Sequence, residues 1–558
     1  MTAATVTETR PFPWEKSYPE GIRWDDPIRT FTLGDYLAQS VARFEKRPAL
    51  IYRDATISYR ELGDFALSVA AAFARLPEAA DGVAIYLPNT PFHPITFFGA
   101  ASAARRIVQL SPLDALMELE HKLKDSGARV LVTLAQPDLL EKAMALRGAG
   151  LVDRVFVADD AMWGNGPVSV ALPPGTEPYS DLLNVQRLDA PVSADPSAVA
   201  LLQYTGGTTG RPKGAMLTHA NITAAAEMSA YLQSVRDRPE DHPDRVLLLL
   251  PLFHSFALAM LLRHLGHGNT VIMGQRFDAD QCLSDIEKHR ITIFHGVPTM
   301  WIALCNHPDI ERRDLTSLAL PTSGGAPLPI AVAEQFRRLT GLRIFQGWGM
   351  TEGAAIGTQH SPIGEVRRGS IGMPQPNFVI QIVDIEDSRR VLPVGQTGEL
   401  RIDGPNVFQG YWNKPEENAR AFVDGYFLTG DVGHLDDDGY VYITDRKKDM
   451  IISGGYNVYP RVLEEAIHEH PAVAECLVIG VPDAYRGQAA KAFVALKPGA
   501  SAFTFEELKA FLRDRVGRHE IPVALEFRAQ LPRSSVGKLS KLSLEQEEAH
   551  RGPPTLTP

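Results

Sequence analysis

The sequence has few cysteines and no excess of positive charge. Only three cysteines occur in 558 residues, and Cys282, Cys305 and Cys476 are far apart, with no Cys-x-x-Cys pair. This spacing argues against a disulfide framework or a zinc site and favours a reducing compartment, for which we expect the cytoplasm. The 67 acidic residues outnumber the 56 basic ones, and the formal net charge is −11. Because nucleic-acid binding normally needs a basic surface, we expect no nucleic-acid partner.

Secretion signals and membrane-spanning runs are also missing. The N-terminus lacks the charged and then apolar pattern of a signal peptide. The stretch 246–262 is almost wholly apolar, but it contains Pro251, His254 and Ser255. It is also short for a membrane helix of about 20 residues. We therefore predict a buried strand followed by a helix from about Phe256, and no transmembrane segment.

The length and the order of the elements predict the fold class. A chain of 558 residues is too long for one compact core. Up to about residue 370, short β-branched strands alternate with amphipathic helices, as in the helix 61–76 followed by the strand 82–87. This alternation predicts parallel sheets covered by helices, and two such sheets fit the length better than one.

The pattern changes near residue 371 and again after a charged link at 445–449. Short strands separated by Gly, Pro and Asp turns lie between these points, and a compact α+β pattern follows them. We predict an α/β protein with a large N-terminal domain over 1–446, made of two helix-covered sheets and a β-rich subdomain from about 371 to 446. A small α+β C-terminal domain follows over 447–558.

A glycine- and threonine-rich segment, 204–214 (YTGGTTGRPKG), follows a predicted strand at 198–202. Glycines let backbone N–H groups approach a ligand, and together with hydroxyls and a lysine they suit polyphosphate oxygens. A flexible surface loop is the simpler alternative, and the spacing is not that of a Walker A loop. The segment predicts a nucleoside triphosphate site. Its candidate binding residues are Thr205, Gly206, Gly207, Thr208, Thr209, Gly210 and Lys213.

A second candidate segment, 347–352 (GWGMTE), follows the apolar run 342–345. Its glycines leave room for a flat base or an acyl group, and Thr351 can donate to a phosphate. Glu352 can bind Mg²⁺, which prefers oxygen ligands and few protein carboxylates. Taken alone, the segment fits an ordinary turn with a solvated glutamate better.

Five segments in this order resemble the motifs of the superfamily that contains acyl-CoA synthetases, firefly luciferase and peptide-synthetase adenylation domains. They are 202–214, 322–328 (TSGGAPL), 347–352, 425–460 and 532–538 (PRSSVGK). The resemblance extends over about 33–542 and is greatest to bacterial long- or medium-chain fatty-acid–CoA ligases. Gly207 stands where many relatives carry Ser. Trp348 replaces the usual Tyr, so a stacking surface for adenine remains without the hydroxyl.

The resemblance implies a role for each matching residue. Asp431 and Arg446 face the ribose, Glu352 binds Mg²⁺, and Lys538 bridges the substrate carboxylate and the α-phosphate. Lys448 is the hinge of a mobile C-terminal lid, and Ser453, Gly454 and Gly455 face the channel for the pantetheine of CoA. The other implied nucleotide- or acyl-site residues are His254, Gly324, Gly325, Ala326, Gly347, Trp348, Gly349, Met350, Thr351 and Ile443.

The implied activity is that of an AMP-forming acyl-CoA synthetase using ATP, Mg²⁺ and coenzyme A. His254 could also be an ordinary core histidine, but the apolar helix after it favours a medium- or long-chain fatty acid as substrate. A dicarboxylic acid is the alternative, if Arg263, His264 and His267 meet a distal carboxylate instead of being solvated.

Two rival functions are a fatty-acyl-AMP ligase that does not use CoA and a non-catalytic binding protein. Homodimer formation is compatible with the sequence.

Overall fold

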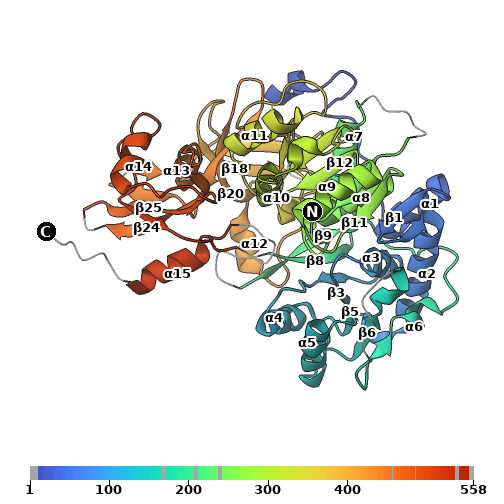
Figure 1. Ribbon diagram of the computed structural model, residues 1–558. Coiled ribbons are helices and arrows are strands. Elements are labelled where there is room, and N and C mark those ends of the chain that lie inside the picture. Colours follow the sequence, from blue (N-terminus) through green and yellow to red (C-terminus); the bar gives the residue numbers. More distant parts are fainter. Residues whose placement is uncertain are drawn as a thin grey trace.

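The chain folds into a large part that runs to Arg446 and a smaller C-terminal part at its side (Figure 1). The computed structural model describes residues 10–164, 171–205, 211–236, 242–454, 456–483, 485–533 and 539–551. The α/β class predicted from the sequence is confirmed, with helix-flanked sheets in the large part and an α+β arrangement in the small one.

A nine-stranded sheet forms one half of the large part, in the order β16-β15-β14-β13-β12-β10-β11-β1-β2. The pairs from β14 to β1 are parallel, and β2, β15 and β16 join antiparallel at the edges. The short apolar runs of the sequence form its strands, because both faces of a parallel sheet are buried. The strands are β1 (Pro48–Tyr52), β2 (Ala55–Ser58), β10 (Arg245–Leu248), β11 (Thr270–Met273), β12 (Ile293–Gly296), β13 (Leu320–Ser323), β14 (Phe345–Trp348), β15 (Thr358–Gln359) and β16 (Met373–Pro374).

A seven-stranded sheet forms the other half, in the order β7-β6-β5-β3-β4-β8-β9. All its pairs are parallel except that of β8 with β9, in which Thr205 lies opposite Lys213. The predicted glycine-rich segment therefore connects two adjacent antiparallel strands. The strands are β3 (Val83–Tyr86), β4 (Ile107–Gln109), β5 (Val130–Leu134), β6 (Arg154–Ala158), β7 (Glu177–Pro178), β8 (Val199–Thr205) and β9 (Lys213–Thr218).

An antiparallel five-stranded sheet follows, in the order β17-β18-β20-β19 with β21 paired to β20. Its strands are β17 (Val379–Val383), β18 (Gly398–Asp403), β19 (Phe422–Val423), β20 (Tyr426–Leu435) and β21 (Val441–Arg446). Buried residues of this sheet, such as Ile380 and Phe427, belong to the same apolar core as Leu201 and Phe294 of the two larger sheets. The β-rich sheet is therefore fixed to the two larger sheets, because apolar side chains of all three sheets are buried in one core.

The C-terminal part has a sheet of its own, in the order β23-β22-β25-β24 with β26 paired to β25. Two separate apolar clusters stabilise it, one around Leu463 and Val494 and the other around Phe493 and Leu544. Its elements are β22 (Ile451–Ser453), β23 (Tyr456–Val458), α13 (Pro460–His468), β24 (Val473–Asp483), β25 (Gly487–Leu496), α14 (Phe505–Leu512), β26 (Ala524–Phe527) and α15 (Leu542–Arg551).

Helices cover the sheets of the large part, and side-chain caps begin several of them. Ser58 and Glu61 form a reciprocal capping box at the start of α2, which satisfies backbone N–H groups that would otherwise be unpaired. In the described part of the chain, no helix is both long and apolar enough to cross a membrane. The helices are α1 (Leu33–Phe44), α2 (Tyr59–Arg75), α3 (Phe92–Ser102), α4 (Leu116–Ser126), α5 (Pro137–Gly148), α6 (Ser180–Leu183), α7 (His219–Gln233), α8 (Ser255–Gly266), α9 (Ala279–His289), α10 (Pro298–Cys305), α11 (Ile330–Thr340) and α12 (Pro415–Ala421).

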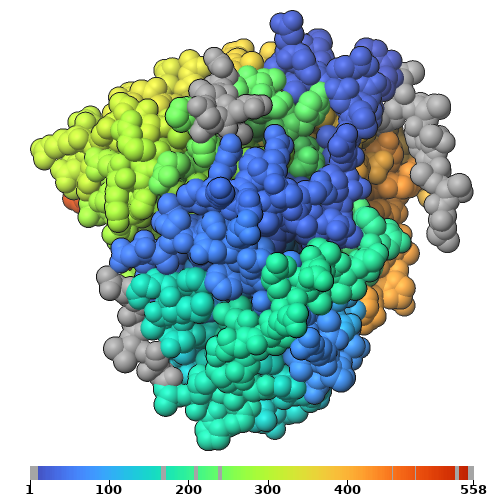
Figure 2. Space-filling view, turned by 90° about the vertical axis from the view of Figure 1, so that its right-hand side faces the viewer, coloured from blue at the N-terminus to red at the C-terminus, as the bar shows by residue number. Residues whose placement is uncertain are grey.

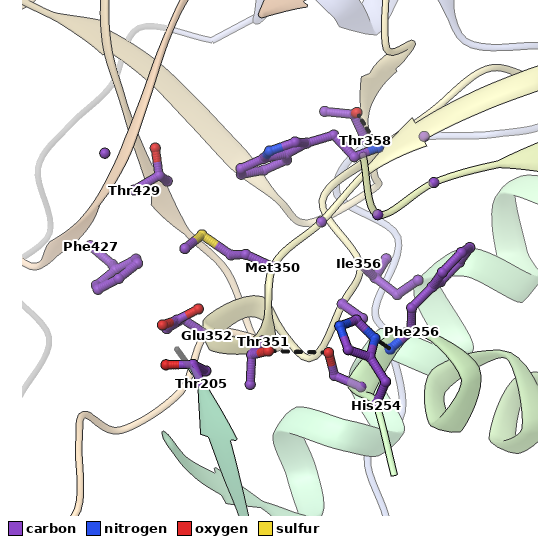
Figure 3. A pocket seen from close by; sticks show the side chains of 18 of the residues that line it. Thr205, His254, Phe256, Met350, Thr351, Glu352, Ile356, Thr358, Phe427 and Thr429 are labelled. Atoms are coloured by element: carbon purple, nitrogen blue, oxygen red, sulfur yellow. Dashed lines mark hydrogen bonds between the residues drawn. The ribbon is translucent and has the colours of Figure 1, made fainter. Parts of the chain in front are cut away.

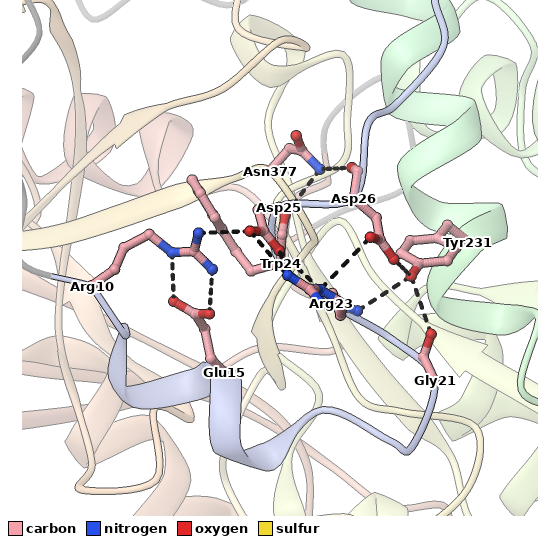
Figure 4. Close-up of polar contacts among 9 residues, drawn as sticks. All are labelled: Arg10, Glu15, Gly21, Arg23, Trp24, Asp25, Asp26, Tyr231 and Asn377. Atoms are coloured by element: carbon pink, nitrogen blue, oxygen red, sulfur yellow. Dashed lines mark hydrogen bonds and ion pairs between the residues drawn. The ribbon is translucent and has the colours of Figure 1, made fainter.

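Residues 10–31, which we call the N-terminal strap, connect α7 with the start of the β-rich sheet. Arg10 pairs with Asp25 at 2.9 Å, and the Asn377 amide donates to the carbonyl of Asp26 at 2.7 Å (Figure 4). The Asp26 carboxylate also accepts a hydrogen bond from Tyr231 of α7. Figure 2 shows the molecule turned by 90° from the view of Figure 1, and residues from the first 200 positions, coloured blue to blue-green, cover most of the face that it shows.

Candidate active site

A cavity of about 810 Å³ opens at the carboxyl ends of β12, β13 and β14 in the nine-stranded sheet. In α/β proteins with parallel strands, ligands bind at this edge of the sheet. The predicted site residues that line the cavity are Thr205, Lys213, His254, Gly324, Gly325, Gly347, Trp348, Gly349, Met350, Thr351, Glu352 and Arg446. Segments far apart in the sequence therefore meet at one place, and Figure 3 shows Thr205, His254, Thr351 and Glu352 around it.

Other predicted site residues lie elsewhere. Asp431 is buried behind Trp348 and Arg446, and Ala326, Ile443, Lys448, Ser453 and Gly454 are not on the described wall of the cavity. The predicted residues Gly206, Gly207, Thr208, Thr209, Gly210, Gly455 and Lys538 lie outside the described residues. Their roles stay predictions.

Glycine at position 349 is required by packing. A Cβ atom there would lie 2.0 Å from the carbonyl oxygen of Ala355, which is backbone and cannot move aside as a side chain could. The chain can therefore turn tightly before Thr351, which keeps Thr351 and Glu352 at the cavity wall.

Glu352 is a buried carboxyl group on the cavity wall. It is 7 % exposed, and the Tyr411 hydroxyl donates a 2.7 Å hydrogen bond to its Oε1. Burial raises the pKa of Glu352, although the Tyr411 hydrogen bond and the positive charge of Arg446 oppose the shift. A buried carboxylate facing a polar cavity is a natural ligand for a hard cation.

Lys213 lies close to the same corner of the cavity. Its ammonium group forms an ion pair with Glu417 of α12 and lies 5.2 Å from the centre of the Tyr411 ring. Lys213, Tyr411 and Glu352 therefore form a chain of polar groups along one wall. An anionic ligand would compete with Glu417 for the ammonium group, because Glu417 also lines the cavity.

Behind another wall of the cavity, the Asp431 carboxylate is held by two donors, both of which line that wall. The Trp348 indole N–H donates to one oxygen at 2.8 Å, and the Arg446 guanidinium contacts the other at 2.9 Å. Asp431 and Arg446 lie opposite each other on the paired strands β20 and β21, which explains how residues fifteen positions apart meet. Asp431 is the main cause of a raised pKa for Arg446. The tryptophan thus supplies a polar contact as well as a flat surface.

The N-terminal end of α8 forms a third wall. His254 caps this helix by accepting from the Phe256 backbone N–H at 3.2 Å, and it also lines the cavity. Ser255 and Thr351 share a hydrogen bond of 3.2 Å between their hydroxyls (Figure 3). The predicted helix from about Phe256 is confirmed, and its first turn adjoins the segment that carries Glu352.

The three residues that could bind a distal carboxylate lie in different places, although they follow one another on α8 and just after it. Arg263 is buried and lines the cavity, contrary to the simpler expectation that it is solvated. His264 is also buried, but it lies behind His295, to which it is hydrogen-bonded at 2.8 Å. His267 lies away from this cavity and binds Glu227 at 3.0 Å.

Within a few residues after Arg446, the chain passes from the large part to the C-terminal part. The Lys447 ammonium group binds Glu399 at 2.9 Å and the carbonyl of Ile385 at 2.8 Å, so this residue is fixed to the β-rich sheet. The Lys448 side chain is half exposed, and Ser453 is buried inside the C-terminal sheet, where it pairs with Gly487. None of the described residues after Arg446 lines the cavity.

Tyr411 and Glu417 are among the residues of the cavity wall that were not predicted. Tyr411 lies in a Gly-Tyr-Trp segment, and Glu417 follows it on α12, more than fifty positions from Glu352. A buried aromatic residue after glycine is a weak signal, because turns of this kind are common. Their importance comes from long-range packing against Lys213 and Glu352.

Comparison with known proteins finds two family models in the expected order. The model described as AMP-binding enzyme matches residues 37–412, and the model described as AMP-binding enzyme C-terminal domain matches 462–538. A long-chain-fatty-acid–CoA ligase of Bacillus subtilis is 37% identical over 96% of this chain and 98% of its own length. A feruloyl-CoA synthase of Amycolatopsis is 38% identical over 83% of this chain and 87% of its own. The crystal structure of ATP-bound MatB from Rhodopseudomonas palustris covers 93% of this chain and 99% of its own, with 27% identity and a TM-score of 0.83.

Proposed function

The chain belongs to the family of AMP-binding enzymes, and from that premise we propose that it is an ATP-dependent, AMP-forming acyl-CoA synthetase. Its substrate is a medium- or long-chain fatty acid, activated as an acyl-adenylate and transferred to coenzyme A. The long-chain-fatty-acid–CoA ligase of Bacillus subtilis, which matches over nearly the whole of both chains, supports this class of reaction.

One observation carries the proposal: predicted site residues from five separate stretches line one cavity in complementary positions, namely 205–213, 254, 324–325, 347–352 and 446. Lys213 and Glu352 lie along one wall, and the Trp348–Asp431–Arg446 group lies at another. The first pair suits phosphates and a cation, and the second suits a flat base and ribose hydroxyls. The apolar residues Phe256 and Met260 line the same cavity and suit an acyl chain.

The residues around Glu352 fit a magnesium ion. Within the described residues no group of three or more His, Cys, Asp or Glu side chains forms a metal cage. Mg²⁺ does not need one, because it is commonly held by one or two carboxylates and the phosphates of its nucleotide. Glu352 would supply the carboxylate, with Thr351 beside it. When bound, the ion neutralises phosphate charge and favours departure of pyrophosphate.

We propose two half-reactions at this site. In the first, a carboxylate oxygen of the acid attacks the α-phosphorus of ATP, the bond to the β-phosphate bridge breaks, and pyrophosphate leaves. Thr205, Lys213 and Thr351 hold the phosphates, and Asp431 orients the ribose. In the second, the CoA sulfur attacks the acyl carbon, the carbon–oxygen bond of the mixed anhydride breaks, and AMP leaves with that oxygen.

The two half-reactions need different surroundings, and we propose that the C-terminal domain supplies them in turn. Lys538 is needed while charge moves onto the leaving pyrophosphate, and it must withdraw before CoA enters. Lys448 is the proposed hinge for this change. Its half-exposed side chain and its place between β21 and β22 support that role.

The three cysteines are free and buried, which supports a reducing compartment such as the cytoplasm.

The test is acid-dependent release of pyrophosphate by the purified protein, followed by thioester formation. We expect pyrophosphate and AMP with octanoate, laurate or palmitate, and an acyl-CoA product when CoA is added. Release of pyrophosphate with no thioester in the presence of CoA would identify an acyl-AMP ligase. Failure to form AMP with a broad panel of acids would contradict the proposal.

A further inference from the structure

One face of α8 runs along the cavity from its reactive end inward. Phe256, Met260 and Arg263 all line the cavity, and their spacing of four and then three residues places them on one side of the helix. The helix starts at Ser255, which contacts Thr351 next to Glu352 (Figure 3). With a rise of 1.5 Å per residue, Arg263 lies about 12 Å farther along the helix axis than Ser255. Arg263 therefore marks the far end of this wall.

The far end is polar, whereas the wall before it is apolar. Arg263 is 5 % exposed, and its Nη1 donates to the Ser229 hydroxyl at 3.2 Å. The Ser229 hydroxyl in turn donates to Oε1 of Gln359, a second cavity residue, at 3.3 Å. Hydrogen bonds therefore hold the guanidinium in place beyond the apolar stretch formed by Phe256 and Met260.

The histidines near this end add polarity without adding charge. His295 lines the cavity, receives or donates a 2.6 Å hydrogen bond with Thr322, and contacts His264 at 2.8 Å. Burial lowers the pKa of both histidines well below the ordinary value, and the nearby Arg263 charge contributes. Both rings are neutral near pH 7, so the positive charge at the far end of the cavity is that of Arg263.

A second cavity of about 350 Å³ lies on the other side of this arginine, under the N-terminal strap. Among the described residues, Arg263 alone lines both cavities. Three acidic residues line the second cavity, and each also binds another group: Asp26, Glu227 and Asp244. Glu227 accepts from Tyr36 at 2.8 Å, and Asp244 is contacted by Arg236 at 3.1 Å. Arg263 thus separates the acyl side of the first cavity from a polar space beneath the surface.

We propose that Arg263 sets which of these medium- and long-chain acids the site prefers, by binding an oxygen-bearing group, above all a second carboxylate, at the far end of the acyl chain, so that plain fatty acids are used more slowly. This inference rests on the proposed acyl-CoA synthetase activity. A guanidinium binds a carboxylate through two parallel hydrogen bonds and stays charged at all ordinary pH values. A plain alkyl end would instead face a buried charge that it cannot solvate, and a longer chain would have to displace the arginine to enter the second cavity.

The experiment compares acids matched in length, with pyrophosphate release as the readout. For the wild type, we expect kcat/KM for sebacate to exceed that for decanoate by about 10²-fold, because a site built for hydrogen bonding rejects the analogue that lacks the group. Suberate should likewise be preferred to octanoate. Arg263→Met, which keeps length without charge, should reverse this preference and improve the use of palmitate. Arg263→Lys should keep part of it.

The matched control is Arg29→Met, because Arg29 lines the second cavity but not the first. This variant should keep the wild-type preference, and the KM for ATP should not change in any variant. A wild type that prefers decanoate to sebacate would overturn the inference even if Arg263→Met failed to fold. So would a preference that Arg263→Met leaves unchanged. In both cases the synthetase activity stands, whereas absence of AMP with every acid would remove the proposed function itself.

Discussion

The β-rich sheet and the C-terminal part both follow the nine-stranded sheet, but they are held in different ways. The β-rich sheet shares one continuous apolar core with the two large sheets. The C-terminal part has its own clusters, and within the described residues no member of them precedes Ile451. Described hydrogen bonds cross the boundary, such as the Arg461 N–H to Asp445 at 2.8 Å and the Ile330 N–H to Glu465 at 3.3 Å.

This difference suggests a division of work. Separating an apolar core exposes its whole buried area to water, at about 25 cal/mol for each Å². Polar contacts can be exchanged for contacts with water at a net cost of only about 1 kcal/mol each. The β-rich sheet is therefore suited to hold Asp431 and Arg446 in fixed positions, and the C-terminal part is suited to move between two arrangements. The following predictions test this contrast.

The largest effect is expected for Glu352→Gln in the fixed part. The change should reduce adenylate formation by about 10³-fold, as measured by pyrophosphate release, because the carboxylate is lost. Burial raises the pKa of Glu352, so the folded state holds this proton more tightly than the unfolded state, and the charged form lowers stability as pH rises through that pKa. The melting temperature of the variant at pH 8 should therefore not fall. A loss of several degrees would show that Glu352 stabilises the fold.

Lys538→Met should reduce adenylate formation by about 10²-fold while leaving the affinity for ATP unchanged, since the contact is made as charge develops in the transition state. Single-turnover rates and nucleotide binding measure the two effects separately. The control is Lys509→Met, because Lys509 pairs with Glu506 on its own helix, α14. Equal losses in the two variants would argue against a special role for Lys538.

Lys448→Pro tests whether the C-terminal part moves. Proline fixes φ, so thioester formation should fall by at least about 10-fold while adenylate formation is kept. Single-turnover assays of the two steps, with Lys448→Ala as the control that keeps the backbone free, give the comparison. Equal slowing of both steps by proline would count against a hinge at this residue.

Trp348→Phe should have the smallest effect, a rise of about 10-fold in the KM for ATP. The flat ring remains, but Asp431 loses a hydrogen bond worth about 1.5 kcal/mol to a charged group. The control is Trp412→Phe, because the Trp412 indole donates to the Asp125 carbonyl away from the cavity wall. An unchanged KM in Trp348→Phe would show that Asp431 is held sufficiently by Arg446.

Strands, helices and motifs could be predicted from the sequence, but the residues that contact them in the folded chain were predicted less well. Strands such as β8 and β11 are short apolar runs bounded by turns, so local pattern was enough to find them. Thr351, Glu352 and Lys213 were assigned to one nucleotide site through the resemblance of their motifs to a known superfamily. The Trp348 contact to Asp431 depends on the packing of separate sheets, which no local pattern records.

Arg263 shows the same limit of local information. An arginine after an apolar helix segment is usually solvated, because charged side chains rarely lie inside. Here the side chain is buried, since α7 places Ser229 beside it and the N-terminal strap covers the cavity behind it. The helical spacing from Phe256 and Met260 was visible in the sequence. The partners that keep the guanidinium inside come from distant segments.

The central claim is that an acid is activated by direct attack on the α-phosphorus of ATP, and isotope transfer tests it most directly. The acid is labelled with ¹⁸O in its carboxylate and incubated with ATP and CoA, and the AMP is analysed by mass spectrometry. The account predicts AMP that carries one ¹⁸O atom from the acid, formed together with pyrophosphate and acyl-CoA. AMP without the label, or release of ADP in its place, would contradict it.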